Sequence, residues 1–498
     1  MRFSILLCFL SSLFLILSFN LADFSGLAWI SFVPLFFSLE NRVKKQAFFL
    51  SYLWGLFFWA GLIYWLAKVT FLGYIFLVFC LSFYFGLFGI LVSLFNKNNS
   101  LAQSLLIPST WVFLEFLRTY LFTGFGWAIL GYSQYKNLPL IQIADITGVY
   151  GVSFLIVLVN FTIYSIFSKN YLAVRKIENI LFTLFFILLS LIYGYCSLKR
   201  TTDDAVCRRL RVSLIQANIP PYQKWDEEFK KDIFERYFFL TKKAYRDKPS
   251  LIIWPETSFP GYWEEEKDLR ERVFFLAKEL NSYILLGTPV GENNFTYNSA
   301  IIISPEGREL NRYYKIHLVP FGEYLPFPKI FGFLEQRFAI GRYTRGTEYT
   351  IFKIRDPRGE YNYPRGEYNF SVLICFEDIF PNFVRKFVKG GAMFLVNITE
   401  DGWYGETPAS FQHAQATVFR AIENRRYLVR VANTGYSCII DEKGRIVSEV
   451  KDEQGKKLFI TKVHSAEIIP QTKETFYSLW GDWFVFICLI IILLGMFV

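Results

Sequence analysis

The sequence predicts a polytopic α-helical membrane domain followed by an α/β domain, and two features lead to this fold class. Charged residues are rare early in the chain, because residues 1–198 hold only 16 of the 96 Lys, Arg, Asp and Glu residues. The apolar residues there form stretches of about 20, long enough to cross a hydrocarbon core as helices. From about residue 208, short apolar strands alternate with amphipathic helices, which is typical of a covered α/β sheet.

The apolar stretches predict seven membrane spans before residue 200 and an eighth at the end of the sequence. We place them near residues 3–19, 22–39, 47–67, 71–95, 101–122, 147–167, 178–198 and 480–498. The first has the look of a signal peptide but no clear small-residue cleavage site, so we expect an uncleaved anchor. The expected domains are a seven-helix transmembrane domain (1–200), an outer domain (208–465) and a C-terminal transmembrane helix (478–498).

The basic residues of the short loops set the expected orientation. With a cytoplasmic N-terminus, that side of the membrane carries eight Lys and Arg residues and the opposite side three. Long domains translocate largely regardless of charge, so residues 199–479 are expected outside. The net charge of +10 is dispersed along the chain, which favours anionic membrane lipid over nucleic acid as the partner.

Three residues near the ends of predicted strands are candidates for chemistry. Cys375 ends the strand LIC at a strand-to-helix turn, where α/β proteins present nucleophiles, although its position fits a buried structural cysteine equally well. Glu256, between Pro255 and Pro260, is a candidate general base or an ordinary solvated turn residue. Lys315 is able to stabilise an oxyanion, but a lone lysine is usually a surface residue.

Other residues leave further possibilities open. Glu323, eight residues after Lys315, is expected to orient that lysine or a substrate amine, or to be solvated. A Cys/His hydrolase that uses His413 stays possible beside a purely structural hydrogen bond for this helical histidine. The seven cysteines show no C-x-x-C or Cys/His spacing, so we expect neither a zinc site nor another cofactor.

Three segments resemble the nitrilase superfamily. They are WPETSFP around Glu256, YYKIHLVPFGEYLP around Lys315 and LICFED around Cys375, and the likeness continues in NITEDGWYG and QHAQATVFRAIENRRYLVRVANTGYS. The resemblance implies a nitrilase-like αββα sandwich as the catalytic domain over 208–465. It also implies Cys375 as nucleophile, Glu256 as general base and Lys315 as electrostatic stabiliser.

The membrane part narrows the resemblance to the apolipoprotein N-acyltransferase family. The segments FLEFLRTYLFTGFGWAILGYSQ (113–134) and IQIADITGVYGVSF (141–154) carry this likeness, together with the order of spans and domains. The resemblance implies transfer of an acyl chain from a phospholipid to the N-terminal diacylglyceryl-cysteine of an apolipoprotein. It also implies a bacterial inner membrane, with the catalytic domain in the periplasm.

The same resemblance assigns accessory residues. Glu323 and Glu377 match accessory acidic positions, and Trp225 matches a substrate-side tryptophan. Phe376 stands where many members have Tyr, and Glu400 stands where the superfamily pattern has Asn. These two departures concern substrate positioning and leave the reaction class unchanged.

Other interpretations of the sequence stay open. A membrane-anchored nitrilase-type amidase or hydrolase would share the chemistry up to a thioester on Cys375. A non-catalytic scaffold would not need all three triad residues, and a transporter is disfavoured because most charges near the spans lie at their ends. The aromatic-rich stretch 321–343 is expected to form a lid, or to pack and anchor at the membrane interface.

Overall fold

The computed structural model describes residues 1–20, 24–95, 100–200, 209–332, 341–357 and 367–495. Its internal contacts divide the chain into two units, each considered by itself. Unit 1 comprises Met1–Arg200, Thr407–Glu423 and Thr475–Val498, and unit 2 comprises Thr201–Glu406 and Asn424–Glu474. Helix α14 (Ala409–Asn424) therefore falls almost wholly in unit 1, although it lies in the chain between two strands of unit 2.

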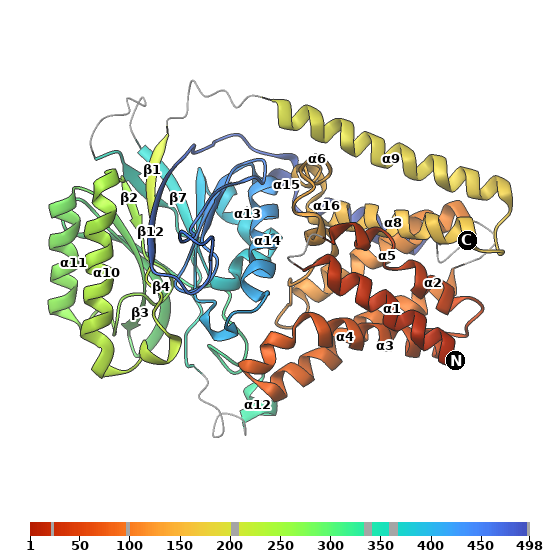
Figure 1. Ribbon diagram of the computed structural model, residues 1–498, viewed down its shortest axis with the longest axis horizontal. Coiled ribbons are helices and arrows are strands. Elements are labelled where there is room, and N and C mark those ends of the chain that lie inside the picture. The colour runs from red at the N-terminus through yellow and green to blue at the C-terminus, as the bar shows by residue number, and fades with distance from the viewer. Residues whose placement is uncertain (21–23, 96–99, 201–208, 333–340, 358–366, 496–498) are drawn as a thin grey trace. The chain divides into compact units, whose positions relative to one another are not determined.

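The described part of unit 1 is built from helices, seen in Figure 1. The longer ones are α1 (Arg2–Ser18), α3 (Lys44–Leu62), α4 (Phe71–Leu94), α5 (Ser100–Tyr120), α8 (Val149–Phe167), α9 (Ala173–Lys199), α14 (Ala409–Asn424) and α16 (Trp483–Gly495). The shorter ones are η1 (Ser25–Trp29), α2 (Val33–Leu39), η2 (Tyr64–Lys68), η3 (Leu130–Gln134), α6 (Leu138–Ile141), α7 (Ala144–Thr147) and α15 (Phe476–Trp480).

Three helices in the described part are long and apolar enough to cross a membrane, as judged by length and composition. They are α4, α8 and α9, while α1 and α16 are apolar but shorter. Two predicted spans are interrupted: 22–39 is divided into η1 and α2, with Pro34 in the first turn of α2, and 47–67 is divided into α3 and η2. The apolar helices fit a membrane domain, and the number of spans stays a prediction.

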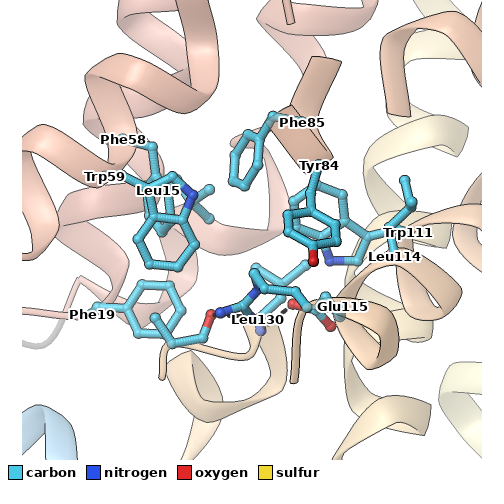
Figure 2. A pocket seen from close by; sticks show the side chains of 12 residues that line it. Leu15, Phe19, Phe58, Trp59, Tyr84, Phe85, Trp111, Leu114, Glu115 and Leu130 are labelled. Carbon is cyan, nitrogen blue, oxygen red and sulfur yellow. Dashed lines mark hydrogen bonds between the residues drawn. The ribbon is translucent and has the colours of Figure 1, made fainter. Parts of the chain in front are cut away.

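Two charged residues of α5 are buried within unit 1 and fix the loop that follows this helix. Glu115 accepts a hydrogen bond at Oε1 from the Leu130 N–H at 2.7 Å, and Arg118 donates to the Trp127 carbonyl at 2.6 Å. Both residues line a pocket whose walls are aromatic side chains of α3, α4 and α5 (Figure 2). These charges therefore serve backbone groups of their own unit, as buried polar groups must.

Unit 2 contains two six-stranded mixed sheets. The strand orders are β12-β1-β2-β3-β4-β5 and β11-β10-β9-β8-β7-β6. In each sheet three parallel strands, β1, β2 and β3 or β7, β8 and β9, are flanked by antiparallel ones. The strands of the first sheet are β1 (Leu210–Gln216), β2 (Leu251–Ile253), β3 (Tyr283–Glu292), β4 (Phe295–Ile303), β5 (Glu309–Tyr314) and β12 (Lys462–Ile468). Those of the second are β6 (Phe352–Arg355), β7 (Glu367–Ile374), β8 (Phe394–Thr399), β9 (Tyr427–Ala432), β10 (Cys438–Ile440) and β11 (Ile446–Glu449).

Helices α10 (Lys230–Ala244) and α11 (Lys267–Leu280) cover one face of the first sheet (Figure 1). Their buried side chains, such as Phe234 and Leu276, share a core with Ile252 and Ile284 of the strands. Helix α13 (Pro381–Lys389) follows β7, and α12 (Pro328–Phe331) is a single short turn. The predicted fold class, helical membrane domain plus nitrilase-like sheets, is confirmed.

The sequence patterns do not predict four of the strands, β4, β5, β6 and β12. The segments of β5 and β12 are antiparallel strands with many partly exposed residues, so they lack the apolar runs that mark buried parallel strands. The Gly, Pro and aromatic residues of 313–370 predict a long irregular segment, and that prediction is wrong over β6 at Phe352–Arg355 and over the start of β7 at Glu367. Strand β4 pairs with β3 over nine residues.

Close packing of α3 against α4 depends on small residues and yields a first prediction. A Cβ at Gly89 would lie 2.5 Å from the Ala47 carbonyl oxygen and 2.3 Å from Ser51 Oγ, so the two helices would have to move apart. Small residues of this kind let membrane helices approach closely. We expect Gly89→Ala to lower the free energy of unfolding by about 1–3 kcal/mol, the range for overpacking.

The measurement is thermal unfolding of the purified protein in detergent. Gly26→Ala is the matched control, because a Cβ at Gly26 would meet no atom within 4 Å. Equal midpoints for the Gly89 and Gly26 variants would contradict the packing described here.

Candidate active site

Cys375 is presented by a strained turn at the end of β7. It is the first residue of the 3-10 turn η8 (Cys375–Ile379), and its φ of +55° lies in the left-handed region that non-glycine residues avoid. Such a conformation costs about 1–3 kcal/mol and persists only where the surroundings hold it. Asn397 Nδ2 donates to the Cys375 carbonyl at 2.9 Å and helps to hold this turn. Cys375 itself is 8% exposed.

Glu377 joins the turn that carries Cys375 to the segment that follows β5. Its Oε2 accepts from the Ile374 N–H at 2.7 Å, and its Oε1 accepts from the N–H groups of Ile316 and His317 at 2.8 and 2.9 Å. The Tyr313 hydroxyl donates to the same carboxylate at 2.8 Å. Burial raises the pKa of Glu377 to about 7, and the backbone donors act against that rise. Glu377, which the resemblance assigns as an accessory acid, is fully buried. It joins the segment that carries Lys315 to the turn that carries Cys375.

Glu256 lies just beyond β2 in a turn that is also constrained. The next residue, Thr257, has a φ of +46°, and the Gly287 carbonyl accepts from the Ser258 N–H at 2.8 Å. A Cβ at Gly287 would lie 2.6 Å from the Pro255 carbonyl oxygen, so only glycine lets β3 pass this close behind Glu256. The Glu256 side chain is buried and points its carboxylate to other site residues.

Lys315 lies between two carboxylates. Its Nζ donates to Glu256 Oε1 at 3.2 Å and to Glu323 Oε1 at 3.0 Å, and the side chain is 1% exposed. Asn298 Nδ2 donates to the same two oxygens at 2.8 and 2.7 Å. Burial acts to lower the pKa of Lys315, but Glu256 and Glu323 outweigh it and hold this pKa well above its ordinary value. Lys315 is therefore an ammonium.

The Cys375 thiol is close enough to Glu256 and Lys315 for their charges to change its pKa. Burial raises the pKa of Cys375 well above its ordinary value, and the Glu256 carboxylate raises it further. Lys315 and a hydrogen bond with Thr399 act in the opposite direction but do not reverse the shift. The site thus holds a neutral thiol beside a carboxylate able to take its proton, and an ammonium able to meet negative charge.

The structure brings together six of the seven predicted site residues, whereas the Trp225 side chain is largely exposed. Glu256, Lys315, Cys375 and Glu377 are buried, and the partly exposed Glu323 joins them through Lys315. The Phe376 ring lies next to Lys315, with its centroid 5.8 Å from Nζ, and the Trp225 side chain is 53% exposed.

Several residues of the site gave no signal in the sequence. Asn298 is one of many polar residues in β4, and only the sheet pairing carries it to both carboxylates. Lys224 belongs to no recognisable motif in the segment that contains Trp225, yet it forms a buried ion pair with Glu400. Glu400 was noted only as a departure from a pattern, and its N–H donates to Glu256 Oε2 at 3.0 Å.

The other predicted elements have different surroundings. His413, the alternative base, is in unit 1, where its ring lies 5.2 Å from that of Trp127. Of the predicted lid 321–343, residues 333–340 lie outside the described residues. The two described ends of the stretch are joined by backbone hydrogen bonds, from Gly341 N–H to Gly322 O and from Tyr343 N–H to Glu323 O, both 2.9 Å. The stretch therefore begins and ends beside Glu323.

Two protein families match the chain. The apolipoprotein N-acyltransferase N-terminal domain matches residues 11–162, and the carbon-nitrogen hydrolase domain matches residues 211–472. An apolipoprotein N-acyltransferase of Geobacter metallireducens is 38% identical over 97% of this chain and 92% of its own length. One of Chlorobaculum tepidum is 31% identical over 93% of this chain and 90% of its own. A solved amidase of Nesterenkonia sp. is 16% identical, with a TM-score of 0.38 over 53% of this chain and 91% of that one.

The neutral state of the thiol is open to a direct test. Because burial and Glu256 raise its pKa, we expect alkylation of Cys375 by iodoacetamide to accelerate steadily up to about pH 9 without reaching a plateau. The rate is followed by peptide mass mapping, which separates Cys375 from the exposed thiols Cys80 and Cys196. A plateau reached near neutral pH would instead indicate a preformed thiolate.

Proposed function

The chain belongs to the apolipoprotein N-acyltransferase family, and we propose that it transfers an acyl chain from a phospholipid, through a thioester on Cys375, to an apolipoprotein. The acceptor is the α-amino group of the N-terminal diacylglyceryl-cysteine, and the transfer completes lipoprotein maturation. The observation that carries the proposal is the buried cluster in which Lys315 Nζ contacts Glu256 at 3.2 Å beside the Cys375 thiol.

The first half of the reaction acylates Cys375. Glu256 takes the thiol proton as Sγ attacks the ester carbonyl of the phospholipid, so the neutral thiol need not ionise beforehand. Negative charge develops on the carbonyl oxygen, and Lys315 with the Phe376 N–H stabilises it. The C–O bond of the ester then breaks, and the lysophospholipid alkoxide takes the proton held by Glu256.

The second half transfers the acyl group to nitrogen. The amine attacks the thioester carbonyl, Glu256 accepts a proton from the attacking nitrogen, and Lys315 again stabilises the oxyanion. The C–S bond breaks, an amide forms, and the proton on Glu256 returns to the sulfur of Cys375. Glu323 accepts a hydrogen bond from Lys315, and Asn298 donates to both Glu323 and Glu256, so these two residues keep Lys315 and Glu256 in place through both halves.

The location proposed for this reaction is the outer face of a bacterial inner membrane. The basic residues of the short loops support this orientation, because eight of them fall on the side of the N-terminus and three on the other. Apolar helices such as α4 and α9 support attachment to the bilayer, where both lipid substrates are found.

In the test, the purified protein is incubated with phospholipid and a synthetic diacylglyceryl lipopeptide that has a free N-terminus. The mass of the lipopeptide is then measured over time. Wild-type protein should add one acyl mass to the lipopeptide, and Lys315→Met should reduce the rate by about 100-fold or more, as loss of an oxyanion donor does. Lys353→Met is the matched control, since Lys353 lies on the exposed side of β6 away from the cluster.

A lipopeptide that stays unmodified while free fatty acid accumulates would contradict acyl transfer and identify a hydrolase, in which water resolves the thioester. Full activity of Lys315→Met would contradict the role given to Lys315.

A further inference from the structure

Lys224 and Glu400 form a buried ion pair against Glu256, and the proposed chemistry does not use it. Lys224 lies beyond β1 and Glu400 directly follows β8, and their side chains are only 5% and 6% exposed. Lys224 Nζ contacts Glu400 Oε2 and also donates to the Glu256 carbonyl at 3.1 Å and to Thr257 Oγ1 at 3.3 Å. Because an ammonium has three hydrogens, all of them are engaged.

The carboxylate of Glu400 is equally well satisfied. Oε1 accepts from the Gly402 N–H at 2.9 Å, and Oε2 accepts from Asn433 Nδ2 at 2.7 Å in addition to Lys224. A Cβ at Gly402 would lie 2.7 Å from Glu400 Oε1, so glycine is what allows this N–H to reach the carboxylate. A buried charge with every partner in place indicates a built site rather than a chance contact.

The pair holds Glu256 from two directions. The Glu400 N–H donates to Glu256 Oε2 at 3.0 Å, while Lys224 binds the Glu256 carbonyl behind the side chain. From this geometry we propose that Lys224 and Glu400 are a positioning pair that fixes Glu256 for proton transfer. This inference rests on the proposed function, since it gives Glu256 the role of general base.

The charges explain why the pair is needed. Glu400 adds a second buried carboxylate on the residue whose N–H donates to Glu256, and a buried negative charge is strongly unfavourable unless a cation meets it. Lys224 supplies that cation, whereas an Asn at this position, which the superfamily pattern implies, would need none. The chain therefore carries a glutamate whose charge its own lysine neutralises.

Other ionisable groups also face Glu256, and they set the background for any test with pH. Besides Lys224 and Glu400, they are Lys315, Glu323, Cys375, Tyr343 and Tyr404. Each stays unchanged in the variants below, so a difference in the pH profile reports the pair.

The experiment measures the rate of Cys375 acylation by phospholipid in mixed micelles over a series of pH values. In Lys224→Met, Glu400 is left as an unpaired carboxylate beside Glu256. We expect the rate to fall by about 100-fold, as for a displaced catalytic group. The acidic limb of the pH profile should move upward by about one pH unit, because a nearby like charge disfavours ionisation. The apparent KM for phospholipid should stay within about twofold, as for an interaction made only in the transition state.

The double variant Lys224→Met with Glu400→Gln removes both charges. It should return the acidic limb to its wild-type position and recover at least about tenfold in rate, because the uncompensated charge is gone. The matched control is the double variant Lys230→Met with Glu266→Gln, which removes a part-buried ion pair of unit 2 that touches no site residue, and we expect it to behave as wild type.

If Lys224→Met does not fold, Glu400→Asn replaces it. There Lys224 stays without its counter-ion, and the acidic limb should move downward instead. An unchanged pH profile in these variants overturns the positioning role. So does a loss of acylation rate in Lys224→Met that the double variant does not restore. Absence of any acyl adduct in wild-type protein overturns the proposed function together with this inference, whereas an adduct in wild type with an unaffected Lys224→Met overturns the inference alone.

Discussion

The site depends on one buried ammonium shared by two carboxylates. Lys315 has almost no exposure, and neither it nor Glu256 or Glu323 could be kept charged there alone, because an unpaired buried charge is strongly unfavourable. Held together, with Asn298 bonded to both carboxylates, the three groups stabilise each other's charge. The cluster fixes a carboxylate and an ammonium beside Cys375 before any substrate arrives, and electrostatic catalysis of the proposed kind requires such preorganisation.

The two sheets of unit 2 supply the site in equal parts. Glu256 and Lys315 follow β2 and β5 of the first sheet, and Cys375 and Glu400 follow β7 and β8 of the second. Glu377 joins the halves, because its carboxylate accepts from Ile374 on one side and from Ile316 and His317 on the other. The left-handed φ values of Thr257, next to Glu256, and of Cys375 show that one turn from each sheet is constrained where it carries a site residue.

Much of this arrangement could be predicted from the sequence, and the remainder could not, for physical reasons. The apolar runs of β2 and of the second half of β7 are typical of buried parallel strands, so the sequence places Glu256 and Cys375 near strand ends. Strands β5 and β12 lack such runs, and Asn298 and Lys224 carry no local pattern, because their roles arise only from pairing between distant segments. The family resemblance identified Glu256, Lys315 and Cys375 as candidate site residues. The ion pair of Lys224 with Glu400 is visible only in the three-dimensional structure.

The central claim is that Cys375 carries the acyl group, and the intact mass of the protein after incubation with phospholipid alone tests it most directly. With no amine acceptor present, the account predicts one added acyl mass that hydroxylamine removes and that Cys375→Ala never gains. A rapid-quench series guards against loss of the adduct to water. If the wild-type protein gains no such mass even at the earliest times while remaining folded, Cys375 is not the nucleophile and the account is contradicted.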